Sequence, residues 1–82
     1  MPRFHINIWR GRERMLDIEG RSFRSEDDAR DFALRECRAL ANDEFTEVDR
    51  GRWKIELTDA ASHRVELLSL PDCEQDNNRS AC

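Results

Sequence analysis

Hydrophobic and polar residues alternate with a period of two in one segment near the start of the chain and in another in its second half. Residues 4–9 read Phe-His-Ile-Asn-Ile-Trp, and residues 53–58 read Trp-Lys-Ile-Glu-Leu-Thr. Strict alternation of this kind indicates β-strands with one buried face. A last strand is expected over residues 64–70, where Pro71 ends it because proline cannot donate to a strand ladder. A glycine-containing turn follows the first strand, and a second strand is expected over residues 14–19.

The middle of the chain changes to helical spacing. Ser25 is a good N-cap because its hydroxyl can accept from the free backbone N–H groups of a first turn. Three acidic residues follow it, at the positive end of the helix dipole. We therefore expect a helix from Glu26 to Asp43 or Phe45. Its apolar stripe consists of Ala29, Phe32, Ala33, Cys37, Leu40 and Ala41.

The predicted element order is ββαββ, which indicates a single two-layer α+β domain over residues 1–71. Two hairpins joined by the helix give a four-stranded antiparallel sheet in the order 2-1-3-4, with one helix on one face. Residues 72–82 are polar and lack periodicity, which predicts a disordered polar tail. The sheet face that packs on the helix is expected to comprise Phe4, Ile6, Ile8, Trp53, Ile55, Leu57, Val65 and Leu67.

Three large apolar residues are then left for the opposite, open face of the sheet. Trp9 points there by alternation, and so do Leu68 and Leu70, because the adjacent pair Leu67-Leu68 breaks the period of the last strand. Two interpretations remain open. Either Trp9, Leu68 and Leu70 are interface residues, or a β-bulge or the tail returns the leucines to the core.

The net charge of −4 divides unevenly along the chain. Residues 1–24 hold six arginines against three acids, whereas residues 25–49 hold nine acids against three arginines. An acidic chain repels polyphosphates at long range, so nucleic acid is not the favoured partner. If nucleic acid is nevertheless the partner, the candidates for binding its phosphates are the arginines around the first hairpin, Arg10, Arg12 and Arg14.

The cysteines predict neither a disulfide framework nor a metal site. Their number is odd, and no export signal accompanies them, which favours reduced thiols. Cys37 falls on the apolar stripe of the helix, where a buried small side chain is expected. Cys73 and Cys82 lie in the polar tail without the close spacing of a zinc ligand pair.

The remaining chemistry-bearing residues form no catalytic signature. His5 is expected on the open face and His63 in a turn, and no serine or cysteine motif precedes either. Asp17 and Glu19 would share one face of the second strand, the minimum for a shared cation, but solvation of a strand edge is the favoured explanation. We therefore predict no enzyme, no catalytic residue, no cofactor and no metal site.

Four short motifs stand in order along residues 1–71, beginning with Met1-Pro2-Arg3-Phe4 and ending with Trp53-Lys54-Ile55-Glu56. In these motifs and their spacing, the chain resembles a family of small bacterial proteins classed as a domain of unknown function. The resemblance implies this fold and brings no known activity. The chain departs from the family in its last turn, which lacks the usual glycine, and after Pro71, where polar residues replace an aromatic one. The motifs are Met1-Pro2-Arg3-Phe4, Asp17-Ile18-Glu19-Gly20, Ala29 with Ala33, and Trp53-Lys54-Ile55-Glu56 followed by Asp59.

The sequence favours a small cytoplasmic protein-interaction module. No apolar segment is long enough for a membrane span or an export signal, so we expect no membrane partner. A protein partner or a homodimer is expected, through the open sheet face or the exposed edge strand, and no small-molecule substrate. The alternative is a small nucleic-acid-binding or antitoxin-like regulator that uses Arg10, Arg12 and Arg14, an analogy of fold alone.

Overall fold

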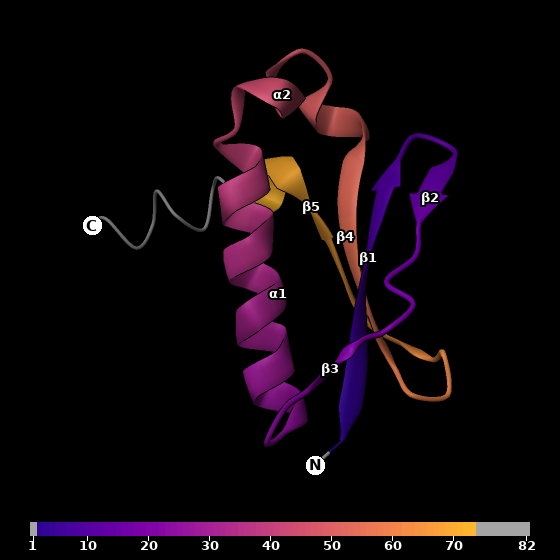
Figure 1. Ribbon diagram of the computed structural model, residues 1–82. Helices are drawn as coiled ribbons and strands as arrows, with labels where there is room; N and C mark the ends of the chain where they lie inside the picture. Colours follow the sequence, from indigo (N-terminus) through magenta and orange to yellow (C-terminus); the bar gives the residue numbers. More distant parts are fainter. Residues whose placement is uncertain (1, 74–82) are drawn as a thin grey trace, which may run out of the picture.

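A computed structural model describes residues 2–73, which form one antiparallel sheet covered on one face by a helix (Figure 1). The sheet order is β2-β1-β4-β5, and a short strand β3 also pairs with β1. The α+β class with one main helix agrees with the prediction, but five strands replace the expected four. The strands are β1 (Arg3–Arg10), β2 (Glu13–Met15), β3 (Arg21–Ser22), β4 (Trp53–Asp59) and β5 (Arg64–Ser69), and the helix is α1 (Glu26–Ala41).

The predicted second strand over residues 14–19 is present as β2 but ends at Met15, where the chain leaves the sheet. β2 and β3 pair with opposite ends of β1, and residues 16–20 form a loop between them. The Asp17 carboxylate accepts the backbone N–H groups of Ile6 (3.1 Å) and Gly20 (3.1 Å), which pins this loop against β1. A side chain bonded to the backbone in this way competes with continued strand pairing.

The helix begins as predicted and ends earlier. Ser25 is its N-cap, and the Ser25 hydroxyl accepts the backbone N–H of Asp28 at 3.2 Å. α1 stops at Ala41 because Asp43 caps a second, short helix, α2 (Glu44–Glu47). A 3₁₀ turn, η1 (Arg50–Arg52), then leads into β4. The predicted end at Asp43 or Phe45 therefore merged two separate helices.

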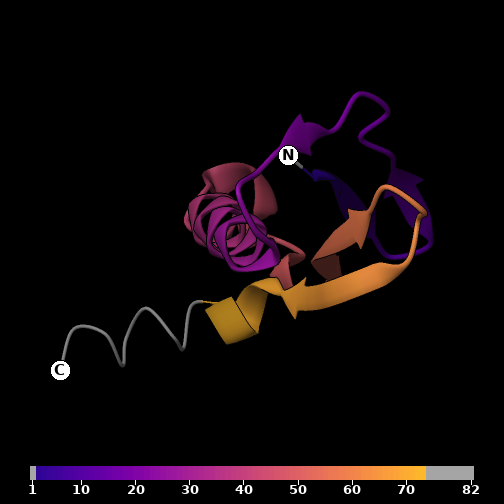
Figure 2. The same ribbon diagram turned by 90° about the horizontal axis from the view of Figure 1, so that it is seen from below.

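The core lies between α1 and the middle of the sheet. Ala29, Ala33, Cys37 and Ala41 recur every four residues and are fully buried. Their small side chains let α1 approach the sheet closely, where it packs on β4 and β5 (Figure 2). Facing them are Phe4, Trp53, Ile55, Leu57 and Leu70, while Ile6, Ile8 and Val65 are partly buried at the margin.

A β-bulge in β5 decides which leucines enter this core. Leu57 pairs with Glu66 but the next residue, Thr58, pairs with Arg64, so Val65 is the extra residue. The side chains that follow therefore lie on the faces opposite to those that uninterrupted alternation would give them.

The bulge overturns three of the predicted positions. Leu68 pairs with Ile55 and packs against the core, and Leu70 is completely buried, so neither is an interface residue. Leu67, expected in the core, pairs with Glu56 and is 38% exposed on the open face. The bulge interpretation that the sequence left open is the one that the structure shows.

The predicted disordered tail begins too early. Leu70 starts a helical turn that continues to Cys73, and Cys73 is 1% exposed. Cys73 forms a disulfide with Cys37 of α1, with 6.1 Å between the Cα atoms, so the prediction of reduced thiols is wrong for this pair. The rest of the predicted tail, residues 74–82 with Cys82, lies outside the described residues.

The turn between β4 and β5 contains a left-handed residue that is not glycine. Ser62 has φ of 68°, a conformation that costs an L-residue about 1–2 kcal/mol. Asp59 holds the turn, since its Oδ1 accepts the backbone N–H groups of Ala61 and His63, each at 2.9 Å. The hydrogen bond from His63 is the main reason that the pKa of Asp59 lies below its ordinary value.

Ser62→Gly should stabilise the protein. Glycine adopts positive φ without steric cost, so we expect the free energy of unfolding to rise by about 0.5–1 kcal/mol in urea denaturation. Ala61→Gly is the matched control, because Ala61 has no positive φ and the added chain entropy should lower stability there. Equal losses in both variants would contradict the strain at Ser62.

Reduction of the Cys37–Cys73 disulfide should destabilise the fold. The bond closes a loop with a sequence separation of 36, for which loop entropy gives a loss of about 3–4 kcal/mol on opening. Urea denaturation of Cys73→Ser, and of the wild type with and without dithiothreitol, measures this loss. Peptide mapping without reductant should recover the Cys37 and Cys73 peptides linked, and a linkage of either to Cys82 would contradict the pairing.

Candidate binding surface on the open sheet face

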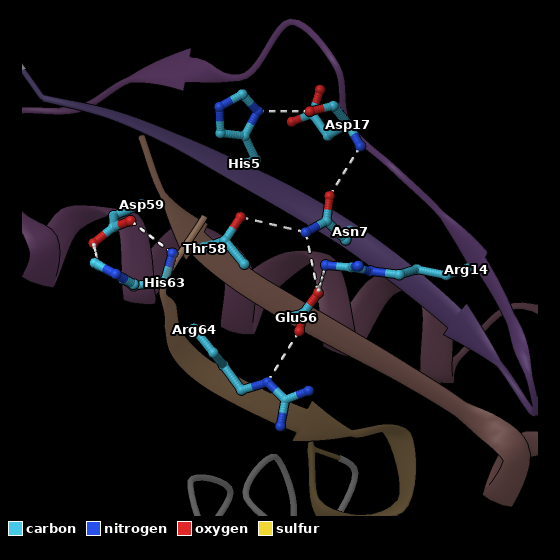
Figure 3. Close-up of polar contacts among 9 residues, drawn as sticks. All are labelled: His5, Asn7, Arg14, Asp17, Glu56, Thr58, Asp59, His63 and Arg64. Atoms are coloured by element: carbon cyan, nitrogen blue, oxygen red, sulfur yellow. Dashed lines mark hydrogen bonds and ion pairs between the residues drawn. The ribbon is translucent and has the colours of Figure 1, made fainter. Parts of the chain in front are cut away.

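The sheet face opposite α1 is built around buried polar side chains (Figure 3). Asn7 of β1 and Glu56 and Thr58 of β4 are each at most 4% exposed. The strand register places Asn7 directly beside Glu56. Alternation turns these residues away from the hydrophobic core, so they are buried by one another and by the long side chains that cover them.

Glu56 is the centre of this polar cluster. Its Oε1 accepts from Asn7 Nδ2 at 3.1 Å and from an Arg14 guanidinium nitrogen at 2.7 Å. Its Oε2 accepts from Arg64 Nε at 2.9 Å. Asn7 Nδ2 also donates to the Thr58 hydroxyl at 3.3 Å (Figure 3). One carboxylate therefore joins side chains from β2, β1 and β5 to β4.

The cluster keeps Glu56 ionised. Burial raises the pKa of Glu56, but the hydrogen bonds from Arg64, Arg14 and Asn7, with the Trp9 indole nearby, outweigh it and lower the pKa below 4.5. Within residues 2–73, the buried indole N–H of Trp9 has no hydrogen-bond partner.

The same cluster holds the loop over residues 16–20. Asn7 Oδ1 accepts the backbone N–H of Asp17 at 3.0 Å, and His5 Nδ1 lies 2.6 Å from the Asp17 carbonyl oxygen. With both oxygens of its carboxylate already accepting backbone N–H groups, Asp17 acts as a loop clamp. The strand that would have aligned Asp17 with Glu19 is absent here, so the basis for a shared cation is lost.

Two of the three predicted phosphate-binding arginines are paired internally. Arg10 Nε lies 2.9 Å from Asp49 Oδ2, and its guanidinium stacks over Trp53. Arg14 is paired with Glu56 and lies over the Trp9 ring, 5.1 Å from its centroid. Arg12 is exposed at the hairpin tip, where no carboxylate of the described residues is in ion-pair range. The hairpin thus does not present three free guanidinium groups.

The predicted interface residue Trp9 does lie on the open face, partly exposed. It borders a hollow of about 490 Å³, which Leu67 of β5 lines from the other side. Three cations complete this basic hollow: Arg52, Lys54 and Arg64. Gly11 lies beside it with φ of 61°, a conformation that residues with a Cβ rarely adopt.

The contacts of the two histidines give no support to a catalytic role. The His5 ring is bonded to a backbone carbonyl, and His63 is exposed beside Asp59, with 3.5 Å between Nδ1 and Oδ2. Within residues 2–73, no group of three His, Cys, Asp or Glu side chains is placed to hold a metal ion. In the same part of the chain, no helix has the length and apolar character needed to cross a membrane.

Comparison with protein families matches residues 3–71 to a domain of unknown function, DUF6894. The match spans most of the 82-residue chain. The chain belongs to this family. No curated protein and no solved structure matches it. Membership of the DUF6894 family confirms the resemblance to an uncharacterised domain family.

The residues that carried the resemblance have structural roles in this DUF6894 domain. Asp17 clamps the loop, Glu56 joins the strands and Asp59 closes the last turn. Strand alternation alone places Glu56 on the open face and does not indicate that it is buried. The feature that could have indicated this burial is the pairing of two polar residues, Asn7 and Glu56, on neighbouring strands with arginines close by.

Glu56→Gln should reduce stability in a pH-dependent way. Because the folded pKa lies below 4.5, the ionised carboxylate stabilises the fold above that pH, and this contribution is lost as pH falls through the folded pKa. We expect a loss of about 1–3 kcal/mol at pH 7 in urea denaturation. The difference from wild type should narrow below about pH 4.5.

Glu47→Gln is the matched control, since Glu47 is exposed and has no hydrogen bond or ion pair among the described residues. It should leave both the stability and its pH dependence nearly unchanged. A loss from Glu56→Gln that is equally large at every pH would contradict the role of the ionised carboxylate.

Proposed function

We propose that this domain is a protein-interaction module that binds an acidic, leucine-containing segment of a partner protein. The binding surface is the basic hollow between Trp9 and Leu67 on the open sheet face. The supporting observation is the combination of exposed apolar side chains with three cations, in a chain whose net charge is −4.

The composition of the hollow suits a protein interface. Tryptophan and arginine are enriched at the centres of interfaces, where an aromatic ring provides contact area and a guanidinium pairs with carboxylates. Lys54 has no carboxylate of the described chain within ion-pair distance, so its charge is available to a ligand. Arg64 is held by Glu56 yet its side chain is 54% exposed.

The charge of the hollow argues for a partner other than a second copy on this face. A two-fold symmetric dimer places the same patch on both sides of the interface. Arg52, Lys54 and Arg64 would then face their own copies, and like charges across an interface are repulsive. Homodimerisation through the outer edge of β5 would leave the hollow free and would be a separate interaction.

Nucleic acid is the less favoured ligand. Arg10 and Arg14, two of the candidates for that function, are neutralised by Asp49 and Glu56. The remaining cations surround one indole ring, without the series of aromatic side chains on which successive bases stack. The overall negative charge further weakens the attraction of a phosphate backbone.

Fluorescence anisotropy with three labelled probes tests this proposal. The probes are a peptide of alternating glutamate and leucine, a lysine-leucine peptide of equal length, and single-stranded oligothymidine. We expect the glutamate-leucine peptide to bind best. Lys54→Glu should weaken that binding about tenfold because it replaces attraction by repulsion, and Leu67→Ser should weaken it through lost apolar contact.

Arg24→Glu is the matched control. Arg24 is exposed, forms no ion pair among the described residues and does not line the hollow, yet its reversal changes the net charge equally. Tighter binding of oligothymidine than of the acidic peptide would assign the surface to nucleic acid. An equal loss in Lys54→Glu and Arg24→Glu, or a light-scattering dimer blocked by Lys54→Glu, would also overturn the proposal.

A further inference from the structure

We infer that a second docking surface lies on the other side of the sheet, in a groove between α1 and β1 that receives a basic amphipathic helix of a partner protein. Two adjoining hollows, of about 170 and 400 Å³, form this acidic groove and share Ile6, Ile8 and Glu36 as lining residues. The surface is independent of the basic hollow, which lies on the opposite face.

The groove exists because one helix is too narrow to cover the sheet. Figure 1 shows α1 running beside β5 and β4, while β1 and β2 lie farther away. Ile6 and Ile8 point to the helix side but are only partly buried. Met15, paired with Ile8 on β2, is 51% exposed.

A second helix is an element that could cover this strip. An α-helix with its side chains is about 10 Å across, and neighbouring helices on a sheet pack at about that spacing. A second helix beside α1 would cover Ile6 and Ile8 and complete the usual two-layer arrangement. Phe32 and Leu40 of α1 line the side of the groove that such a helix would contact.

The rim of the groove is predominantly acidic. Glu36 lies on α1, Asp43 follows its end and Glu19 projects from the loop on the other side. The carboxylates of Glu19 and Glu36 have no ion-pair partner among the described residues. Two cations lie near this rim, since Arg21 and Arg35 lie over the Phe32 ring, 4.5 and 6.0 Å from its centroid. An occupant with lysine or arginine beside an apolar stripe therefore complements the groove.

Other occupants match these features less well. Residues 74–82 of the same chain read Glu-Gln-Asp-Asn-Asn-Arg-Ser-Ala-Cys, which offers no large apolar side chain for Ile6 and Ile8. The one long helix that a second copy could offer, α1, begins with three acidic residues, and these would meet the acidic rim. The charge and shape of the groove together favour a basic helix from another protein.

Two labelled model peptides test the inference on the intact chain. Both carry leucines at helical spacing, with lysines on the polar face of one and glutamates on the other. We expect the lysine peptide to bind, and its amide chemical-shift changes to map to β1 and the facing side of α1. The double variant Glu19→Lys/Glu36→Lys should weaken binding by about threefold to tenfold, because two attractions become repulsions.

Glu13→Lys/Glu47→Lys is the matched control. Both residues are exposed, without an ion pair among the described residues, and lie away from the groove, while the charge change is the same. It should weaken binding less than about twofold. The inference is overturned if the lysine peptide fails to bind at about 1 mM, if its shifts map to Trp9, or if the glutamate peptide produces equal shifts at β1 and the facing side of α1. A light-scattering dimer disrupted by Glu19→Lys/Glu36→Lys would assign the groove to a second copy and would also overturn it.

Discussion

The buried carboxylate of Glu56 is the interaction on which the arrangement of the sheet depends. Each of the four strands along the sheet path supplies one member of its cluster: Arg14 from β2, Asn7 from β1, Glu56 itself from β4 and Arg64 from β5. Burying a charge is costly unless hydrogen bonds replace its hydration. A one-residue slip of any strand would carry its member of the cluster to the helix side, so the cluster specifies the register.

The same cluster connects the fold to both proposed surfaces. Asn7 extends it to Asp17, which holds the loop that carries Glu19 to the rim of the acidic groove. Arg64 extends it to the basic hollow, because this side chain both donates a hydrogen bond to Glu56 and lines the hollow. Side chains whose rotamers are fixed by internal bonds lose less entropy on binding a partner, which favours recognition.

Local signals in the sequence predicted the local features of the structure. Ser25 indicated the start of α1, and Gly11 indicated a turn with positive φ. Each residue meets a requirement of the backbone within a few residues of its own position. The polar face and the core positions of β1 and β4 also followed from alternation. The DUF6894 match added agreement on the family and no further residue roles.

Contacts between distant residues could not be predicted in this way. The broken alternation at Leu67-Leu68 left a β-bulge as one of two interpretations, and only the pairing with β4 shows that it lies at Val65 and exposes Leu67. The Cys37–Cys73 bond depends on a helical turn that begins at Leu70, inside a segment whose composition suggested disorder. The exposed charge of Arg10 and Arg14 was overestimated because their carboxylate partners lie 39 and 42 residues away.

The fold converts the uneven charge along the chain into an uneven charge in space. The carboxylates of the central acidic segment, such as Glu36 and Asp43, lie on the helix side, whereas Lys54 and Arg64 lie on the open face. A sheet separates the two groups, so each can act on a ligand at its own surface without first pairing with the other. At physiological ionic strength, exposed charges that lie more than about 8 Å apart are largely screened from one another. The two proposed surfaces are of opposite sign on one small domain, and they therefore suit partners of opposite charge.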